Sequence, residues 1–430
     1  MLKLLKDAFK VKDIRSRILF TIFILFVFRL GTHITVPGVD AARLQTISGL
    51  PFLSMLDLVS GSAMQRFSIF SMGVSPYITA SIIVQLMQMD IVPKFVEWSK
   101  QGEVGRRKLN QATRYLTLVL GFFQSVALVS AFQFYTQFGF VPNPSFATYL
   151  VIGLVLTTGT MFVTWLGEQI TEKGIGNGVS MIIFAGIISR LPVDLRELYV
   201  DYFVNINQSD IWKSVLFAIF LVLAVVAIVT FVTYFQQAER KIPIQYTKRV
   251  AGAPTSSYLP LKVNAAGVIP VIFASSLITL PNSVLQAFTS FQGETWFEVV
   301  QTIFNYNTVP GAILYTTLIV GFTFFYAFVQ VNPEKLAENL QKQGSYIPSV
   351  RPGKGTEEYV SKLLMRLSTV GSIFLALVAI LPIIAQMLWN LPQSIGLGGT
   401  SLLIVIGVAL ETAKQLEGLM LKRKYTGFIN

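Results

Sequence analysis

Two glutamates, Glu168 and Glu172, are spaced one helical turn apart, and paired carboxylates of this kind can carry out general acid–base catalysis. They end a hydrophobic run and are followed directly by Lys173. A solvated helix end is therefore the interpretation that we favour over a catalytic pair. Residues 174–178 (GIGNG) resemble a phosphate-binding loop, but no Gly-Lys-Ser/Thr follows them and no strand precedes them. We predict instead a tight turn that starts the next helix.

Arg29 and His33 lie four residues apart and so share a helix face near the end of the first hydrophobic run. Charged groups within a membrane are by default functional, but Pro37 and Gly38 follow closely here. We therefore expect this pair to snorkel to the interface or to make a structural hydrogen bond. With one histidine and no cysteine, zinc sites and histidine catalysis are nearly excluded. We predict no catalytic, cofactor-binding or metal-binding residues, and no enzyme.

The amino-acid composition predicts the kind of helices on which these polar residues lie. Of the 430 residues, 53% are hydrophobic and only 13% are charged, whereas about a quarter of a soluble domain is charged. Long charge-poor runs of this kind indicate an all-α polytopic membrane protein. Ten hydrophobic segments are predicted, at about 18–36, 74–90, 115–135, 147–166, 179–191, 212–235, 267–288, 309–331, 367–388 and 400–417.

The charges between these segments are distributed unevenly. If the N-terminus lies in the cytosol and the segments alternate, 28 of the 34 Lys and Arg residues fall on the cytosolic side. This is a strong positive-inside pattern, which places both termini in the cytosol. No segment carries an Asp, Glu, Lys or Arg at its centre. Because ion-coupled transporters usually need such a charge, this argues against a secondary transporter of small solutes, the main alternative function.

A short sequence occurs twice, as residues 73–81 (GVSPYITAS) and 267–275 (GVIPVIFAS). Each copy begins the second hydrophobic segment of a five-segment half, and its Gly and Pro favour a break in the helix. Paired breaks in corresponding helices of two halves indicate a pathway at the interface between the repeats. Val74, Ile78 and Ile82 share one helix face beside the first break, which suggests an apolar constriction that excludes water and ions. Core packing or a lipid-facing stripe is the alternative.

Two predicted cytosolic loops, residues 236–264 and 332–364, exceed a typical connection in length. They are basic and contain Pro and Gly, which favours a projecting surface that docks an acidic or nucleic-acid-rich soluble partner. The alternative is that the basic residues of these loops only set the membrane topology, through attraction to anionic lipid headgroups. The candidate docking residues are Arg240, Lys248, Arg249, Arg351 and Lys354.

Several sequence motifs resemble those of the SecY family, the channel subunits of the bacterial Sec protein translocon. The resemblance covers essentially the whole chain. Its motifs are VPGVD at 36–40, the stretch 61–87, GRRK at 105–108, WLGEQITE at 165–172, GIGNG at 174–178, LPLKVN at 259–264 and GGTSLLI at 398–404. One departure is the charge-free segment 250–258, which is shorter than is usual in the family and weakens the expected partner contacts there.

The resemblance implies a fold of ten transmembrane helices in two inverted five-helix halves that close like a clam shell around an hourglass pore. The expected parts are a basic N-terminal segment (1–17), the first half (18–191), an external linker (192–211), the second half (212–417) and a cytosolic tail (418–430). A plug at about 55–66 is expected to close the outer funnel, with Met55, Leu58, Val59, Met64 and Arg66 as its residues.

Further residues carry roles only through this resemblance. The expected pore ring is Val74, Ile78, Ile82, Val179, Ile183, Ile272 and Ile404. A lateral gate to lipid is expected between the helices that contain the two repeat copies, at Thr79, Ser81, Ser275 and Leu280. The implied partners are the small membrane subunits SecE and SecG, the SecA ATPase motor, the ribosome, signal-bearing polypeptides and membrane lipids, but not DNA.

The sequence therefore predicts a passive protein-conducting channel in the bacterial plasma membrane. Such a channel moves unfolded polypeptides across the bilayer and releases hydrophobic segments sideways into lipid. The driving energy must then come from a partner. An intramembrane enzyme would need paired Asp residues, a metal set or an activated Ser, and none of these is visible in the sequence.

Overall fold

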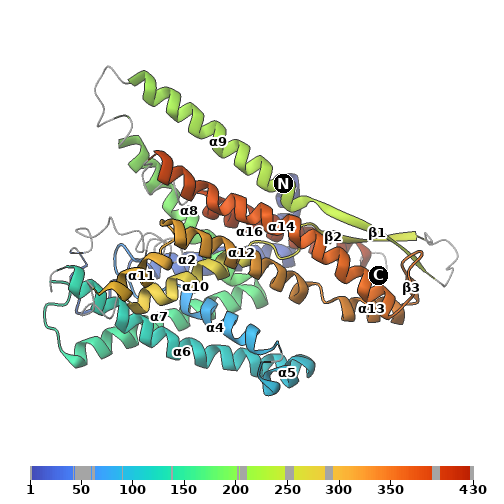
Figure 1. Cartoon of the computed structure of the whole chain (residues 1–430), viewed down its shortest axis with the longest axis horizontal. Helices are drawn as coiled ribbons and strands as arrows, with labels where there is room; N and C mark the ends of the chain where they lie inside the picture. The colour runs from blue at the N-terminus through green and yellow to red at the C-terminus, as the bar shows by residue number, and fades with distance from the viewer. Residues whose placement is uncertain are drawn as a thin grey trace.

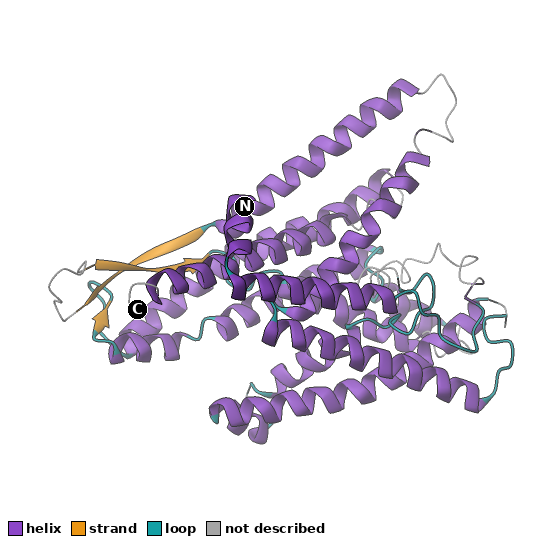
Figure 2. Cartoon of the chain, turned by 180° about the vertical axis from the view of Figure 1, so that it is seen from behind, coloured by secondary structure: helices purple, strands orange, loops and turns teal. Residues whose placement is uncertain are grey.

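The computed structural model describes most of the chain as a bundle of long helices with one small sheet (Figures 1 and 2). The described residues are 2–41, 43, 60, 63–89, 91–136, 139–200, 203, 211–246, 256–285, 294–389 and 398–426.

The first half of the chain contains seven described helices. They are α1 (Leu2–Lys10), α2 (Lys12–Gly31), α4 (Ser75–Met87), α5 (Pro93–Lys100), α6 (Gly102–Tyr135), α7 (Phe146–Lys173) and α8 (Gly178–Tyr199). The second half contains α9 (Ile211–Gln237), β1 (Glu239–Tyr246), β2 (Ser256–Lys262), α10 (Ile269–Leu285), α11 (Thr295–Ile303), α12 (Val309–Gln330), α13 (Pro333–Lys342), β3 (Ser345–Tyr346), α14 (Lys354–Trp389) and α16 (Gly398–Thr426).

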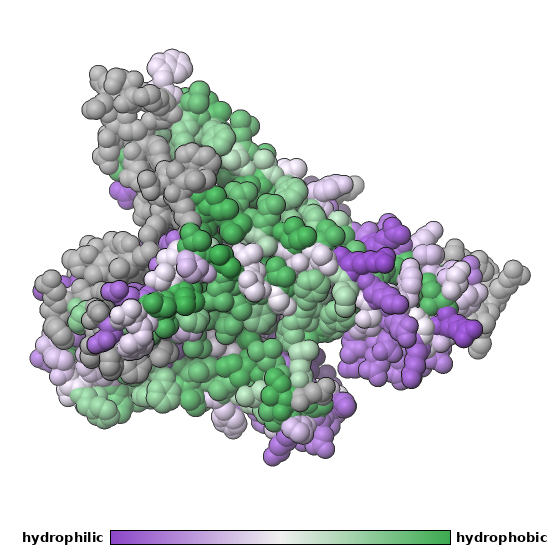
Figure 3. Space-filling model, viewed as in Figure 1, coloured by the Kyte–Doolittle hydropathy of each residue, from purple (hydrophilic) through white to green (hydrophobic). Residues whose placement is uncertain are grey.

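Each of the ten predicted hydrophobic segments overlaps a described helix, which confirms the predicted multi-pass membrane fold. Six of the described helices are long and apolar enough to cross a bilayer, and α4 and α10 are shorter apolar helices. The remaining two predicted segments correspond to α2 and α16. Apolar side chains cover the long helices, whereas polar ones gather at the end that carries β1, β2 and α13 (Figure 3).

The two halves repeat the same pattern of packing. In the first half α4 packs on α6, α6 on α7 and α7 on α8; in the second, α10 packs on α12, α12 on α14 and α14 on α16. The halves meet where α4 contacts α10 and where α8 contacts α16. The predicted repeat is thus visible as a repeated order of contacts.

The predicted helix breaks lie where the repeated sequence begins. Gly73 and Gly267 both adopt a left-handed backbone conformation, with φ of +53° and +67°. Residues with a Cβ rarely adopt this conformation, which explains glycine at both positions. The helices that follow, α4 and α10, each begin two residues after the glycine. A proline stands in the first turn of each helix, where its missing N–H is tolerated.

The two long loops form a three-stranded antiparallel sheet in the order β2–β1–β3, which sequence analysis did not predict. β1 pairs with β2 along its length, from Glu239 opposite Lys262 to Gln245 opposite Ser256. Beneath the sheet, a small apolar cluster joins both loops to the start of α14, and its buried members are Ile242, Leu261, Ile347 and Val360. The prediction of an all-helical chain therefore holds for the membrane-spanning part and not for these loops.

Candidate functional site: an apolar waist above a polar cavity

The seven residues predicted to form the pore ring come from four different helices or their first turns. The structure brings them into one hydrophobic cluster. Six are almost fully buried and Val179 packs against them at the edge. Val74, Ile78 and Ile82 follow a four-residue spacing along α4, so one face of this helix points into the cluster.

Sequence analysis missed other apolar residues of the same cluster. Ile187 lies four residues after Ile183 on α8, and Val408 lies four residues after Ile404 on α16. Both are buried, with exposed fractions of 3% and 2%. The same four-residue spacing that identified the α4 stripe could have found them.

We call the seven predicted pore-ring residues the waist, and a cavity of about 920 Å³ is lined by four of them. Ile78, Val179, Ile183 and Ile272 are among its apolar lining residues. Its polar wall comes mainly from α6 and α7: Glu103, Arg106, Arg107, Asn110 and Arg114 on the first, and Glu168, Gln169, Thr171 and Glu172 on the second. A polar cavity with branched aliphatic side chains in its lining is what a pathway that leads to a hydrophobic constriction would need.

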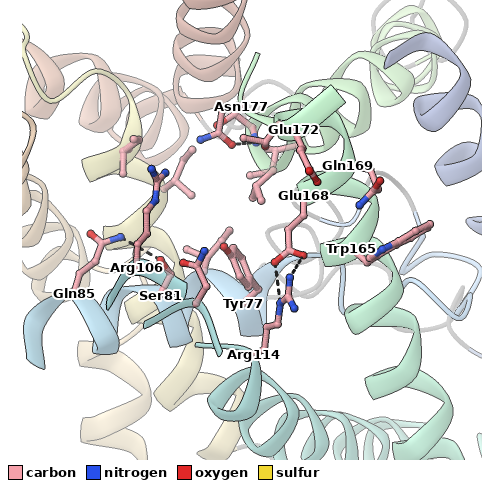
Figure 4. A pocket seen from close by; sticks show the side chains of 18 of the residues that line it. Tyr77, Ser81, Gln85, Arg106, Arg114, Trp165, Glu168, Gln169, Glu172 and Asn177 are labelled. Atoms are coloured by element: carbon pink, nitrogen blue, oxygen red, sulfur yellow. Dashed lines mark hydrogen bonds and ion pairs between the residues drawn. The ribbon is translucent and has the colours of Figure 1, made fainter. Parts of the chain in front are cut away.

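Arg114 on α6 holds Glu168 on α7 with two hydrogen bonds inside this cavity (Figure 4). The Nε–Oε1 distance is 3.1 Å and the Nη2–Oε2 distance is 2.5 Å. Both side chains keep contact with solvent, with exposed fractions of 50% for Arg114 and 27% for Glu168, so the predicted solvated helix end stands and the ion pair is what the prediction missed. The reason is that α6 begins at Gly102, well before the hydrophobic run at 115, so that Arg114 is part of the helix and faces α7. Glu172 is exposed, in keeping with the prediction.

The other polar motifs of the sequence are structural. The Nδ1 atom of His33 lies 2.9 Å from the carbonyl oxygen of Arg29, and Arg29 donates to the Ser189 hydroxyl at 3.2 Å. These contacts confirm the predicted structural hydrogen bond. Residues 174–178 form a tight turn before α8, in which the Gly178 N–H donates to the Thr171 hydroxyl at 2.8 Å. A side chain at Gly178 would collide with the backbone of Gly167.

The predicted plug lies largely outside the described residues, including Met55, Leu58 and Val59. Met64 is buried, and Arg66 is exposed. Directly after them, Phe67 is fully buried, and its ring contacts the rings of Phe132 and Phe140 edge-on, with centroids 5.7 and 4.8 Å apart. The chain between plug and α4 is therefore anchored in the first half.

The predicted lateral gate lies at the contact between α4 and α10. Thr79 is buried, and Ser81, Ser275 and Leu280 are half-buried. The hydroxyls of Thr79 and Ser275 donate to carbonyl oxygens of their own helices at 3.2 and 2.8 Å. Hydroxyls that are satisfied within one helix leave the contact between the helices mainly apolar.

The predicted docking residues lie at the polar end of the molecule. Arg240 on β1 and both Arg351 and Lys354 at the start of α14 are exposed, whereas Lys248 and Arg249 lie outside the described residues. The two loops form one unit because β1 pairs with β3, and the Tyr346 hydroxyl donates to Gln245 at 2.9 Å.

Ten apolar segments that overlap helices, arranged as two halves with the same order of contacts, define a multi-pass membrane protein. The SecY family model matches residues 68–413. "Protein translocase subunit SecY" of Lactococcus lactis subsp. lactis is 64% identical over all 430 residues and 98% of its own length. The protein of the same name from Streptococcus gordonii is 62% identical over 100% of this chain and 98% of its own. The chain belongs to the SecY family.

Solved structures have the same fold. "The structure of a protein conducting channel" aligns with a TM-score of 0.63 at 18% identity, over 94% of this chain and 91% of the other. "Sec61 in the Canine ribosome-channel complex from the endoplasmic reticulum" aligns with a TM-score of 0.60 at 16% identity, over the same shares. The alternative of a small-solute transporter gains no support from these relatives.

Proposed function

We propose that this chain is the channel-forming subunit of a protein translocase, which conducts unfolded polypeptides across a membrane. The family of the chain and its full-length identity to translocase subunits support this function. The observation that carries the mechanism is that seven aliphatic residues from four helices belong to one apolar cluster, and that four of them also line a polar cavity.

At rest, this waist would act as the seal. Branched aliphatic side chains offer no hydrogen bonds to water, so a narrow ring of them favours dewetting and excludes hydrated ions. Side chains can still change rotamers to let an extended polypeptide pass. The channel itself supplies no energy in this mechanism, and a motor or a translating ribosome would have to push or pull the chain.

Hydrophobic segments would leave the channel between α4 and α10. These two helices meet at the boundary between the halves, and each follows a glycine in a left-handed conformation. A contact that is mainly apolar can open toward lipid without stranding polar groups in the bilayer. The plug segment would close the outer side, anchored by Phe67.

The partners would meet the cytosolic loops. One structural relative is named as a ribosome–channel complex, and the exposed Arg240, Arg351 and Lys354 would suit ribosomal RNA or the acidic surface of a motor such as SecA. SecE and SecG would be the membrane partners, and the bacterial plasma membrane the location. Residues of α1, α2 and α16 share one apolar cluster, which supports termini on the same, cytosolic side.

The function can be tested by reconstitution into proteoliposomes with its membrane partners and a motor. A precursor with a signal sequence should become protected from added protease, and a precursor without one should not. If neither precursor became protected from the protease, the proposed function would be refuted. A cysteine in place of the exposed Ser349 should react with an impermeant thiol reagent only from the side to which the motor binds.

A further inference from the structure

The short helix α11 lies between α10 and α12 in the sequence and contacts both of them. It is found at the end of the molecule opposite to the sheet of β1 and β2 (Figure 1). The membrane span of α12 begins at Val309, shortly after α11 ends at Ile303. α11 is therefore at the level of a membrane surface, on the side of the membrane opposite to the sheet.

Three large apolar side chains of α11 are exposed. The exposed fractions are 48% for Trp296, 51% for Val299 and 37% for Ile303. Their spacing of three and then four residues places them on one stripe along the helix, which we call the apolar stripe. Phe297 points to another side of the helix and is only 3% exposed, so the protein covers that side.

A polar stripe runs beside the apolar one. Thr295, Glu298 and Thr302 have the same spacing, and all three are exposed. Because successive residues of a helix are rotated by about 100°, the two stripes adjoin and divide the exposed part of α11 between them. Water would favour polar side chains on both stripes, and acyl chains would not tolerate the carboxylate of Glu298. This division fits a helix that lies at the boundary between lipid and water.

The surroundings of α11 identify lipid as the material next to the apolar stripe. At the start of α12, Val309 and Ile313 are exposed on a helix that spans the membrane. Because α11 packs on α12, the lipid around the start of this span is next to α11. Tryptophan, here Trp296, is enriched at the level of the headgroups. α11 contains no Lys or Arg, so anionic headgroups would not attract it.

We infer that the apolar stripe of α11 inserts into the membrane interface on the side opposite to the sheet, while the polar stripe stays in water. The partner of this surface is a lipid bilayer, at the boundary between headgroups and acyl chains, whatever the charge of the headgroups. The lipid thus fixes the depth of α11 between α10 and α12. The inference goes beyond the proposed function, since it holds whether or not the chain conducts polypeptides.

The test uses single cysteines, because the chain contains none of its own. Val299→Cys and its matched control Thr302→Cys are each labelled with an environment-sensitive fluorophore. The chain is studied with its membrane partners in phosphatidylcholine nanodiscs. The label at 299 should be quenched more by a nitroxide near the lipid headgroup than by one near the end of the acyl chain, and little by aqueous iodide. The label at 302 should be quenched by iodide and much less by either nitroxide.

Two further labels calibrate the quenching. Ile313→Cys on α12 supplies the lipid limit and Tyr258→Cys on β2 the water limit, since both native side chains are exposed. A label at 313 that is quenched by lipid and not by iodide also shows that the labelled chain is inserted. Replacing part of the phosphatidylcholine with anionic phosphatidylglycerol should leave the quenching at 299 unchanged, because apolar contact and not charge holds the stripe.

Four results would overturn the inference. Iodide quenching at 299 as strong as at 302 would mean that the stripe faces water. A label at 299 that no quencher reaches would mean that a protein surface covers the stripe. Stronger quenching at 299 by the deep nitroxide would place α11 among the acyl chains. Lipid quenching at 299 that requires phosphatidylglycerol would mean that headgroup charge, and not apolar contact, holds the helix. Transport is measured separately, so the expected quenching without any transport would overturn the proposed function alone.

Discussion

Gly267 offers a perturbation whose cost can be worked out from the structure. Its φ is +67°, and a Cβ built on it would meet no heavy atom within 4 Å. Gly267→Ala therefore causes no collision, and its whole cost is the backbone conformation, about 1–2 kcal/mol. This changes the population of the described conformation by a factor of about 5–30. We expect the contact between α4 and α10 to open more readily.

The assay compares transport of precursors with intact and with defective signal sequences in proteoliposomes. Gly267→Ala should raise transport of the defective precursor several-fold and leave the intact one little changed. Gly267→Asn should have a smaller effect, because Asn adopts left-handed conformations more readily than Ala. Gly321→Ala on α12 is the matched control, since a Cβ there also meets no heavy atom within 4 Å and φ is not positive.

The control should be neutral or slightly stabilising, because alanine lowers the entropy cost of a helix interior by about 0.5–1 kcal/mol relative to glycine. The reasoning would be refuted if Gly267→Ala and Gly321→Ala gave the same transport of the defective precursor. The reasoning would also be refuted if Gly267→Asn raised transport of the defective precursor more than Gly267→Ala did, since steric strain at positive φ predicts the opposite order.

Three further changes test the waist, the docking surface and the gate. Ile183→Asn or Ile404→Asn places an amide in the apolar ring, so dye-loaded proteoliposomes should leak ions at rest. If vesicles with both variants stayed impermeable to ions, these residues would have a packing role only. Arg351→Glu should abolish motor-driven transport while the protein still accumulates folded in the membrane, and normal transport would remove its docking role. Thr79→Cys with Leu280→Cys should form a disulfide if their Cα atoms lie within about 7 Å. That bridge should stop transport until reduced, and unimpaired transport of the bridged protein would place the gate elsewhere.

Hydropathy and charge predicted the ten membrane segments because a bilayer imposes a length and a composition on every helix that crosses it. The repeated sequence GVxPxxxAS predicted both helix breaks, because glycine adopts the left-handed conformation of residues 73 and 267 without strain. The convergence of the aliphatic ring depended on the family resemblance, since periodicity gives a helix face but not its neighbours.

Other features could not be predicted from local pattern. β1 and β2 contain Pro243 and Pro260, which argue against strands, and their pairing depends on contacts between the two loops. The Arg114–Glu168 pair depends on α6 continuing beyond its apolar part, where hydropathy gives no signal. A smaller cavity, of about 250 Å³, combines residues from α9, α10, α12 and α16, which only the tertiary structure brings together.

The central claim is that translocating polypeptide passes through the aliphatic waist. The chain has no cysteine, so Ile78→Cys supplies a single thiol in the ring, and Phe220→Cys supplies one on α9, where Phe220 is 65% exposed. Each is combined with an arrested precursor that carries one cysteine. We predict a disulfide from position 78 only, and only while the precursor spans the channel. A disulfide from position 220 alone, or from neither position while the precursor is protected from protease, would contradict the account.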